Sequence, residues 1–283
     1  MRLVVQGLLV QPRQLQHLAQ LCGNQAQDFR QIATHAYYLP DIAKINTEIE
    51  AYCASQQLDC AFVADHHTLD NFGLVLMDMD STLITIECID EIADMHGLKL
   101  QVAAVTQAAM RGEIEFAESL RLRVALLKGL DESALQRVYD ERLRLSPGTE
   151  QWIAACKQHA VRTMVVSGGF DFFVERVKTL AGLDYAQANR LEIVNGELTG
   201  KVLGDIVDAQ AKADWLRKQR QALGLEAAQV IAIGDGANDL IMMADAGVSI
   251  AYHAKPIVQE HATYALNYVG LDGAANLFSL NPY

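Results

Sequence analysis

The 283-residue sequence predicts an α/β fold with a Rossmann-like parallel sheet core, an inserted helical cap and a small N-terminal α/β segment. Three short apolar runs, each followed at once by polar residues, carry this prediction: Phe72–Met77, Thr163–Val166 and Val230–Ile233. They are too short for helices and apolar on both faces, which is typical of buried parallel strands. An amphipathic stretch separates the second run from the third, and a longer helical stretch separates the first from the second.

Residues 1 to 71 form the first predicted domain, a small α/β appendage. Its predicted order is strand, helix, strand, helix, strand, at Leu3–Val5, Leu15–Leu21, Ala36–Leu39, Asp41–Ala54 and Ala61–Ala64. The second predicted domain comprises residues 72 to 283 and contains the three buried strands.

Residues from about 88 to 150 lack a strand pattern and predict a helical cap inserted into the core domain. Glycines punctuate its four candidate helices, at Ile89–His96, Leu100–Met110, Ile114–Leu127 and Glu132–Leu145. Since the stretch follows the first strand, we expect the cap to lie over the carboxyl edge of the sheet. Met110 and Phe116 are candidates to close over a substrate, with core packing as an equal alternative. Beyond the cap, Asn195-Gly196 between two apolar runs predicts a hairpin turn without chemistry.

Two carboxylates directly follow the first strand. Asp78 and Asp80 stand two residues apart in the sequence MDMDST. Ligands of open parallel sheets bind at the carboxyl edge, where one carboxylate can attack a substrate while the other transfers a proton. Alone, the pair is only suggestive, because a strand-end carboxylate is also a common capping or solvated group.

Later segments add the other groups that a phosphoryl-transfer site needs. These groups are Ser167, Gly168, Lys212, Asp235, Asn238 and Asp239. A phosphate monoester is a dianion, so a carboxylate can attack it only if the repulsion is cancelled. Mg²⁺ prefers oxygen ligands, and Asp78 and Asp235 are the natural ones. Lys212 supplies a compact positive charge, and Ser167 and the N–H of Gly168 can donate hydrogen bonds to phosphoryl oxygens.

The second carboxylate of the pair has the most specific predicted task. The leaving alkoxide needs a proton, so Asp80 must be protonated when the ester bond breaks and can then take a proton from the hydrolytic water. Nearby negative charge favours that neutral form of Asp80.

These ordered segments resemble the haloacid dehalogenase superfamily, with DxDST at 78–82, the strand-end Ser167, then Lys212, and GDxxND at 234–239. Within it, the chain is similar to the phosphoserine phosphatase family. The segments DMDSTLITIE, SGGFDFFVERV and GDGANDLIMMADAGVSIAYHAKP carry this likeness, which covers roughly residues 72 to 270.

The resemblance implies the catalytic and metal-binding roles. It makes Asp78 the nucleophile and Asp80 the acid and base. It implies a Mg²⁺ cofactor held by Asp78, Asp235 and the backbone carbonyl of Asp80, with Asp239 orienting the metal site.

The resemblance also implies which residues bind O-phospho-L-serine: Glu87, Arg123, Ser167, Gly168, Lys212 and Asn238. A zwitterion needs one anionic and one cationic host beyond the phosphate site, and Glu87 and Arg123 fit those needs. From the residues alone, Glu87 could equally stabilise a helix start. Arg121 and Arg123 point about 200° apart on a helix, so only one can face a site, and the resemblance selects Arg123.

The implied activity is Mg²⁺-dependent hydrolysis of O-phospho-L-serine, the last step of L-serine biosynthesis, through an aspartyl-phosphate intermediate. The resemblance further implies that residues 1 to 71 are a reduced ACT-like regulatory domain. A phosphatase for another small phosphorylated amino acid or metabolite would use the same chemistry. Three other function classes fit the sequence less well. A phosphoaspartate receiver lacks an acid two residues after its phosphorylated Asp, and a P-type ion pump needs membrane spans. A binding protein without activity would not need every chemical position filled.

The charge and composition of the sequence limit the kinds of molecule and cellular compartment that the protein is expected to meet. A net charge of −12 argues against nucleic acid or an anionic membrane, and no apolar run or signal-peptide pattern predicts a membrane span or export. The five cysteines lack metal-ligand spacing and indicate free thiols in the cytoplasm. We expect the pair His66-His67 to be solvated, and a homodimer is compatible with the sequence.

Overall fold

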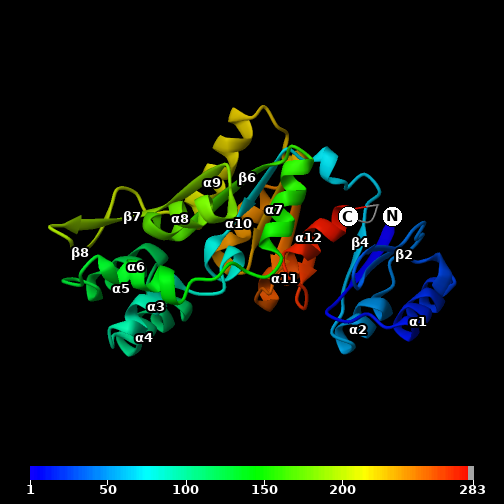
Figure 1. Cartoon of the computed structure of the whole chain (residues 1–283), viewed down its shortest axis with the longest axis horizontal. Coiled ribbons are helices and arrows are strands. Elements are labelled where there is room, and N and C mark those ends of the chain that lie inside the picture. The colour runs from blue at the N-terminus through cyan, green and yellow to red at the C-terminus, as the bar shows by residue number, and fades with distance from the viewer. Residues whose placement is uncertain (280–283) are drawn as a thin grey trace.

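The computed structural model describes residues 1–279, which form an elongated molecule with the N-terminal segment and the cap at opposite ends of a central sheet (Figure 1). The sheet has seven strands in the order β11-β10-β9-β5-β6-β7-β8. They are β5 (Leu74–Met77), β6 (Arg162–Phe170), β7 (Tyr185–Val194), β8 (Glu197–Leu203), β9 (Val230–Gly234), β10 (Val248–Tyr252) and β11 (Tyr264–Leu266). All neighbours pair in parallel except β7 and β8, which form the predicted hairpin across Asn195-Gly196. The predicted α/β class with a parallel core is confirmed.

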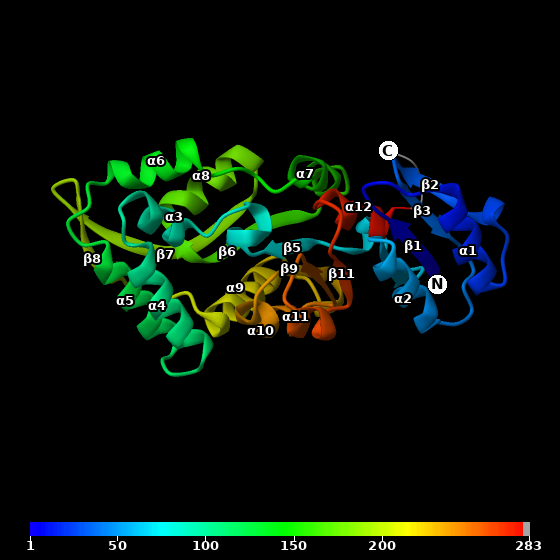
Figure 2. The same ribbon diagram turned by 90° about the horizontal axis from the view of Figure 1, so that it is seen from below.

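Helices cover both faces of this sheet (Figure 2). One face carries α7 (Thr149–Gln158), α8 (Asp171–Ala181) and α12 (Asp272–Phe278), and the other carries α9 (Ala209–Ala222), α10 (Leu240–Ala244) and α11 (Pro256–His261). Strand β5 shows why its sequence is continuously apolar. Val75 and Met77 join the hydrophobic cluster on the first face, and Leu74 and Leu76 join the cluster on the second.

The cap consists of four helices: α3 (Cys88–Met95), α4 (Lys99–Met110), α5 (Phe116–Leu126) and α6 (Ser133–Glu141). All four predicted helices are present, but the last ends earlier than expected. Its predicted final residues leave the helix because Leu145 forms an antiparallel bridge with Ile84, where the chain re-enters the core. Among residues 1–279, no helix is both long and apolar enough to cross a membrane.

The N-terminal segment is a four-stranded antiparallel sheet with two helices on one face. Its elements are β1 (Arg2–Gln6), α1 (Pro12–Cys22), β2 (Arg30–Ala33), β3 (Ala36–Leu39), α2 (Thr47–Ser55) and β4 (Asp59–Val63), and its strand order is β2-β3-β1-β4.

Two predictions for this segment were wrong. Strand β2 was missed, because Arg30 and Gln31 are exposed and polar at the sheet edge and hide the apolar pattern. The second helix begins at Thr47 rather than at Asp41. Asp41 has a φ of 57°, which a right-handed helix excludes, and Asn46 caps the helix by accepting a hydrogen bond from the N–H of Glu48.

The two faces of the N-terminal sheet contact different partners. Leu3 and Val5 pack under α1 and α2. Val4 and Val63 point to the opposite face and belong to the same hydrophobic cluster as the core strands. The segment and the core therefore share one continuous apolar interior.

Buried polar contacts reinforce this junction. Asp59, only 3% exposed, accepts hydrogen bonds from three consecutive backbone N–H groups of the core, those of residues 267–269, at 2.7, 2.9 and 3.1 Å. Arg2 donates to the carbonyl of Leu277 at 2.8 Å, so the first strand of the chain is tied to its last helix. These contacts place charged groups where leaving them unpaired would be costly.

Candidate active site

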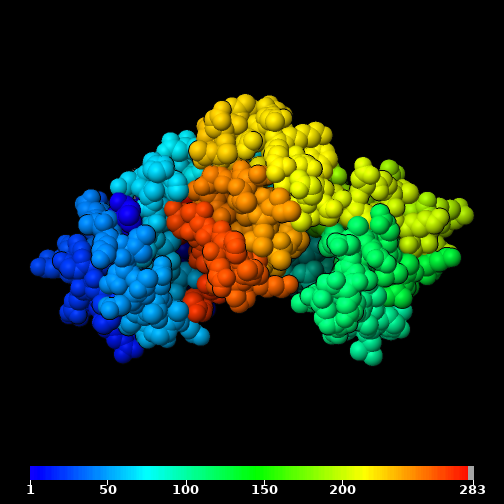
Figure 3. All heavy atoms as spheres, turned by 180° about the vertical axis from the view of Figure 1, so that it is seen from behind, coloured from blue at the N-terminus to red at the C-terminus, as the bar shows by residue number. Residues whose placement is uncertain are grey.

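The carboxyl ends of β5, β6 and β9 open into a cavity of about 790 Å³ between the sheet and the cap. Figure 3 shows the corresponding hollow between the cap (green) and the core (orange and yellow). Eight of the ten predicted catalytic, metal-site and phosphoserine-binding residues line this cavity: Asp78, Asp80, Glu87, Arg123, Ser167, Gly168, Asp235 and Asn238. The other two, Lys212 and Asp239, are buried against Asp78.

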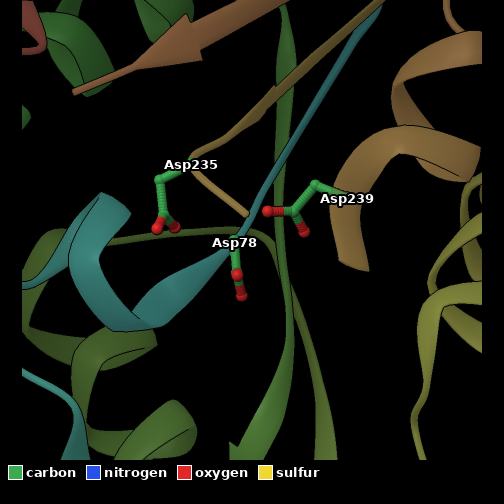
Figure 4. Close-up of side chains that lie close together, drawn as sticks. All are labelled: Asp78, Asp235 and Asp239. Carbon is green, nitrogen blue, oxygen red and sulfur yellow. The ribbon is translucent and has the colours of Figure 1, made fainter. Parts of the chain in front are cut away.

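Three aspartates form the centre of the site (Figure 4). Asp78, Asp235 and Asp239 each offer a carboxylate oxygen within 4.8 Å of the others. The ammonium of Lys212, 1% exposed, lies 2.8 Å from Oδ1 of Asp78 and 2.7 Å from Oδ1 of Asp239. This lysine therefore ties together the ends of the first and third predicted strands.

Burial among like charges shifts the titration of these groups. Burial and the neighbouring Asp239 raise the pKa of Asp78, although Lys212 opposes them. Burial and Asp239 likewise raise the pKa of Asp235 to about 6. Burial disfavours the charge of Lys212, but Asp239 and Asp78 outweigh it and raise the pKa of the lysine. One lysine is therefore not enough to keep all three carboxylates ionised, and a further positive charge would favour their ionised forms.

The donor atoms of this cluster fit a hard divalent cation, since all are oxygens. Thr82 donates a hydrogen bond to Oδ1 of Asp235 at 3.1 Å and orients that carboxylate. Oδ2 of Asp239 accepts the N–H of Gly236 at 3.1 Å, while its Oδ1 holds Lys212. Asp78 and Asp235 are the cavity-facing members that could hold such a cation.

Asp80, two residues after Asp78, is held by two donors. Its Oδ1 accepts the N–H of Cys88 at 3.0 Å, and its Oδ2 accepts the hydroxyl of Ser167 at 3.3 Å. Burial raises the pKa of Asp80. A Cβ on Gly169 would stand 2.7 Å from Oδ2 of Asp80, so a larger residue there would displace the carboxylate or the loop.

Hydrogen bonds fix the loop after β6. The N–H of Gly169 donates to the hydroxyl of Ser167 at 2.8 Å. Asn189 donates to the carbonyl of Gly168 at 2.8 Å and accepts the N–H of Val207, also at 2.8 Å. No local pattern in the sequence indicates Asn189, because its partners are backbone groups distant along the chain.

Glu87 is positioned by an unusual turn. Ser81 has a φ of 56°, a left-handed conformation that side chains disfavour, and its hydroxyl donates to Oε1 of Glu87 at 2.7 Å. Removal from bulk water and the nearby Asp80 raise the pKa of Glu87 to about 7, although water in the open cavity still reaches the side chain.

Arg123 reaches the same cavity from α5 of the cap, whereas Arg121 is exposed on the other side of the helix. Burial lowers the pKa of Arg123, against the opposing charges of Asp90 and Glu87. Among residues 1–279, its Nε is a buried donor without a hydrogen-bond partner. An unpaired buried donor of this kind suits an acceptor supplied by a ligand.

The predictions for Phe116, Met110 and the histidine pair are partly confirmed and partly wrong. Phe116 lines the cavity and lies against Gly168, where an added Cβ would meet its ring at 3.0 Å, while Met110 is a 70% exposed part of the cavity rim. For the histidine pair, His66 is exposed as expected, but His67 is half-buried: its Nδ1 lies 2.7 Å from the hydroxyl of Tyr264, and burial lowers its pKa. A local sequence pattern could not predict that His67 lies at the junction with β11.

The chain is similar to known phosphatases over the residues that form this site. The haloacid dehalogenase-like hydrolase family matches residues 75–244. A phosphoserine phosphatase of Polaromonas sp. is 52% identical over 209 residues, covering 72% of this chain and 89% of the relative. One of Haemophilus influenzae is 40% identical over 286 residues, covering 98% of this chain and 88% of the relative.

The chain belongs to the haloacid dehalogenase-like hydrolases and, within them, to the phosphoserine phosphatases.

Solved structures extend this likeness beyond the phosphatase domain. A probable phosphoserine phosphatase from Vibrio cholerae superposes with a TM-score of 0.85 at 38% identity, covering 98% of this chain and 86% of the other. A substrate-bound phosphoserine phosphatase superposes with a TM-score of 0.69 at 39% identity, covering 74% of this chain and 99% of the other. The N-terminal segment is thus included in the first likeness, which covers almost the whole chain.

Proposed function

We propose that this phosphoserine phosphatase hydrolyses O-phospho-L-serine to L-serine and phosphate with Mg²⁺, through an aspartyl-phosphate on Asp78. The observation that carries the proposal is that one cavity is lined by a paired nucleophile and acid, Asp78 and Asp80, and by two oppositely charged side chains, Glu87 and Arg123. A phosphorylated zwitterion is the small substrate that needs all of these groups.

In the first step, Asp78 attacks phosphorus while the bond from phosphorus to the serine oxygen breaks. Both Lys212 and the N–H of Met79 contact Oδ1 of Asp78, so Oδ2 is left to act as the nucleophile. Burial raises the pKa of Asp80, which favours its neutral form, and the reaction requires it to be protonated at this point so that it can give its proton to the leaving serine oxygen. L-Serine then leaves as the neutral alcohol.

In the second step, Asp80 takes a proton from water as the water oxygen attacks the phosphorus of the aspartyl-phosphate. The bond from phosphorus to Asp78 breaks, phosphate is released, and both carboxylates return to their starting states. In the free enzyme the Ser167 hydroxyl donates its single proton to Asp80 and accepts the N–H of Gly169; with substrate bound it would turn that proton to a phosphoryl oxygen, together with Gly168 and Asn238. Their fixed geometry supplies positioning, on which phosphoryl transfer largely depends.

Asp78 and Asp235 would hold the Mg²⁺, with the carbonyl of Asp80 as a further ligand and Asp239 keeping Lys212 and the metal-site loop in place. When bound, the cation offsets the repulsion between the phosphate dianion and the attacking carboxylate.

The cap would supply substrate recognition. Arg123, whose Nε has no partner among the described residues, would bind the substrate carboxylate. Glu87, held by Ser81, would bind the ammonium. We therefore expect Arg123→Ala to reduce kcat/KM for phosphoserine at least about a hundredfold, because a charge-assisted pair is lost, but to change hydrolysis of p-nitrophenyl phosphate only a few-fold. Arg121→Ala is the matched control, and equal losses on both substrates would reduce Arg123 to a structural role.

The primary test measures phosphate release from L-phosphoserine, L-phosphothreonine, homoserine phosphate and p-nitrophenyl phosphate, with Mg²⁺ and with chelator. Asp78→Asn controls for a contaminating phosphatase. A strong preference for phosphoserine that disappears with chelator and in the variant is the expected result. Activity on p-nitrophenyl phosphate alone would keep the mechanism and reject the substrate, leaving another small phosphorylated metabolite as the candidate.

We also propose that residues 1–71 are a docked unit that stabilises the phosphatase domain of residues 72–283, whose cap spans about 88–150. The separate sheets support this division, and the continuous hydrophobic cluster between the N-terminal sheet and the core supports the docking. All five cysteines are free, which supports a cytoplasmic site of action.

A further inference from the structure

The charges around the cavity pose a problem for an anionic substrate. Seven carboxylates line it: Asp78, Asp80, Glu87, Asp90, Glu115, Asp208 and Asp235. The whole chain adds a net charge of −12. A phosphate dianion that approaches this opening therefore meets an unfavourable potential, which lowers the rate of productive encounter.

Lys212 cannot solve this problem. Its side chain is 1% exposed and contacts two carboxylates, so its charge is already compensated and does not line the cavity. Among the described residues that line the cavity, only Arg123 and Lys255 are cationic at neutral pH. Arg123 stands on the cap and is the proposed host of the substrate carboxylate. That leaves Lys255 for the phosphate.

Lys255 is built into the core side of the opening. Its backbone N–H donates to the carbonyl of Asp235 at 3.2 Å, and Pro256 begins α11 directly after it. These two constraints hold the Lys255 backbone beside a proposed metal ligand, while its side chain is exposed. Within residues 1–279 no carboxylate lies at ion-pair distance from its ammonium, although the ammonium is near enough to Asp235 to act on that carboxylate electrostatically. Its charge is therefore not held in a close ion pair and can act on a ligand beside Asp235.

We propose that Lys255 is a further phosphate-binding residue, which attracts the substrate phosphate at the cavity opening and holds phosphate beside Asp235 before attack and after hydrolysis. This inference rests on the proposed function. An exposed lysine acts through a long-range field that salt screens, whereas a buried structural lysine would show no such salt dependence.

The test compares Lys255→Ala, Lys255→Arg and Lys201→Ala with the unaltered holoenzyme at ionic strengths of about 0.02 M and about 0.5 M. Lys201 on β8 is exposed, does not line the cavity and gives the same change in net charge. At low ionic strength we expect Lys255→Ala to lower kcat/KM for phosphoserine about fivefold with little change in kcat, and to weaken competitive inhibition by inorganic phosphate by a similar factor. At high ionic strength the loss should shrink below about twofold. Lys255→Arg should retain most of the activity, and Lys201→Ala should match the unaltered enzyme.

Three results would overturn the inference: no change in Lys255→Ala, a loss of equal size at both ionic strengths, or an equal loss in Lys201→Ala. A fall in kcat with unchanged phosphate inhibition would also reject it. Each of these leaves the unaltered enzyme active on phosphoserine. Failure of the unaltered enzyme on that substrate would instead reject the proposed function.

Discussion

Asp59 offers a quantitative test of how firmly the N-terminal segment is joined to the phosphatase core. Replacing it with alanine leaves the N–H groups of residues 267–269 without acceptors in a buried junction. Each unsatisfied buried donor costs about 1–3 kcal/mol, and partial relaxation will reduce the sum. We therefore expect Asp59→Ala to lower the free energy of unfolding by about 3–5 kcal/mol. Asp59→Asn keeps one oxygen acceptor and should lose about half as much.

Urea unfolding followed by circular dichroism measures these differences, with phosphate release recorded in parallel. Asp65 is the matched control: it lies two residues beyond β4, its side chain is 76% exposed, and it pairs with the N-terminal amine at 3.0 Å. Asp65→Ala should cost less than about 1 kcal/mol. If Asp59→Ala costs no more than Asp65→Ala, the three hydrogen bonds do not stabilise the junction and the segment is not anchored as we describe.

Three further predictions concern the reaction. Gly169→Ala places a Cβ 2.7 Å from Oδ2 of Asp80, so displacement of that acid should lower kcat about tenfold to a hundredfold without a large fall in melting temperature; unchanged kcat would show that Asp80 tolerates the shift. Asp80→Asn should abolish turnover in the phosphate-release assay but preserve Mg²⁺ binding measured by calorimetry, and near-normal turnover would exclude Asp80 as the acid. The pKa of Glu87, raised to about 7, means that it gains a proton as pH falls from 8 to 6 and loses its attraction for an ammonium. The ratio of kcat/KM for phosphoserine to that for p-nitrophenyl phosphate should therefore fall over this range, and Glu87→Gln should flatten it; a flat ratio in the unaltered enzyme would argue against Glu87 as the ammonium host.

The sequence predicted the parts of the molecule that depend on local pattern. Strand β5 is apolar on both faces because helices cover both, and this made it recognisable together with the carboxylates at its end. The four cap helices could also be predicted from the sequence, because glycines separate them. By contrast, β2 is a polar edge strand that becomes regular only by pairing with β3.

Site residues that depend on distant partners could not be predicted in the same way. Asn189 holds two backbone groups from different loops, and Lys255 reaches the cavity only because α11 starts beside Asp235. Helical geometry could not choose between Arg121 and Arg123, but the folded chain does, because only Arg123 lines the cavity. The sequence shows the type of each of these residues but not which distant segments lie beside it in the folded chain.

The hydrogen bond from Arg2 to Leu277 joins residues 275 positions apart, and this has a consequence for folding during synthesis. The N-terminal sheet emerges from the ribosome long before α12, the helix that receives its second apolar face. Contacts of such long separation form slowly because the loop they close is large. The face that carries Val4 and Val63 must therefore remain uncovered until α12 has been synthesised, and over that interval we expect chaperones that bind exposed apolar strands to bind the nascent chain.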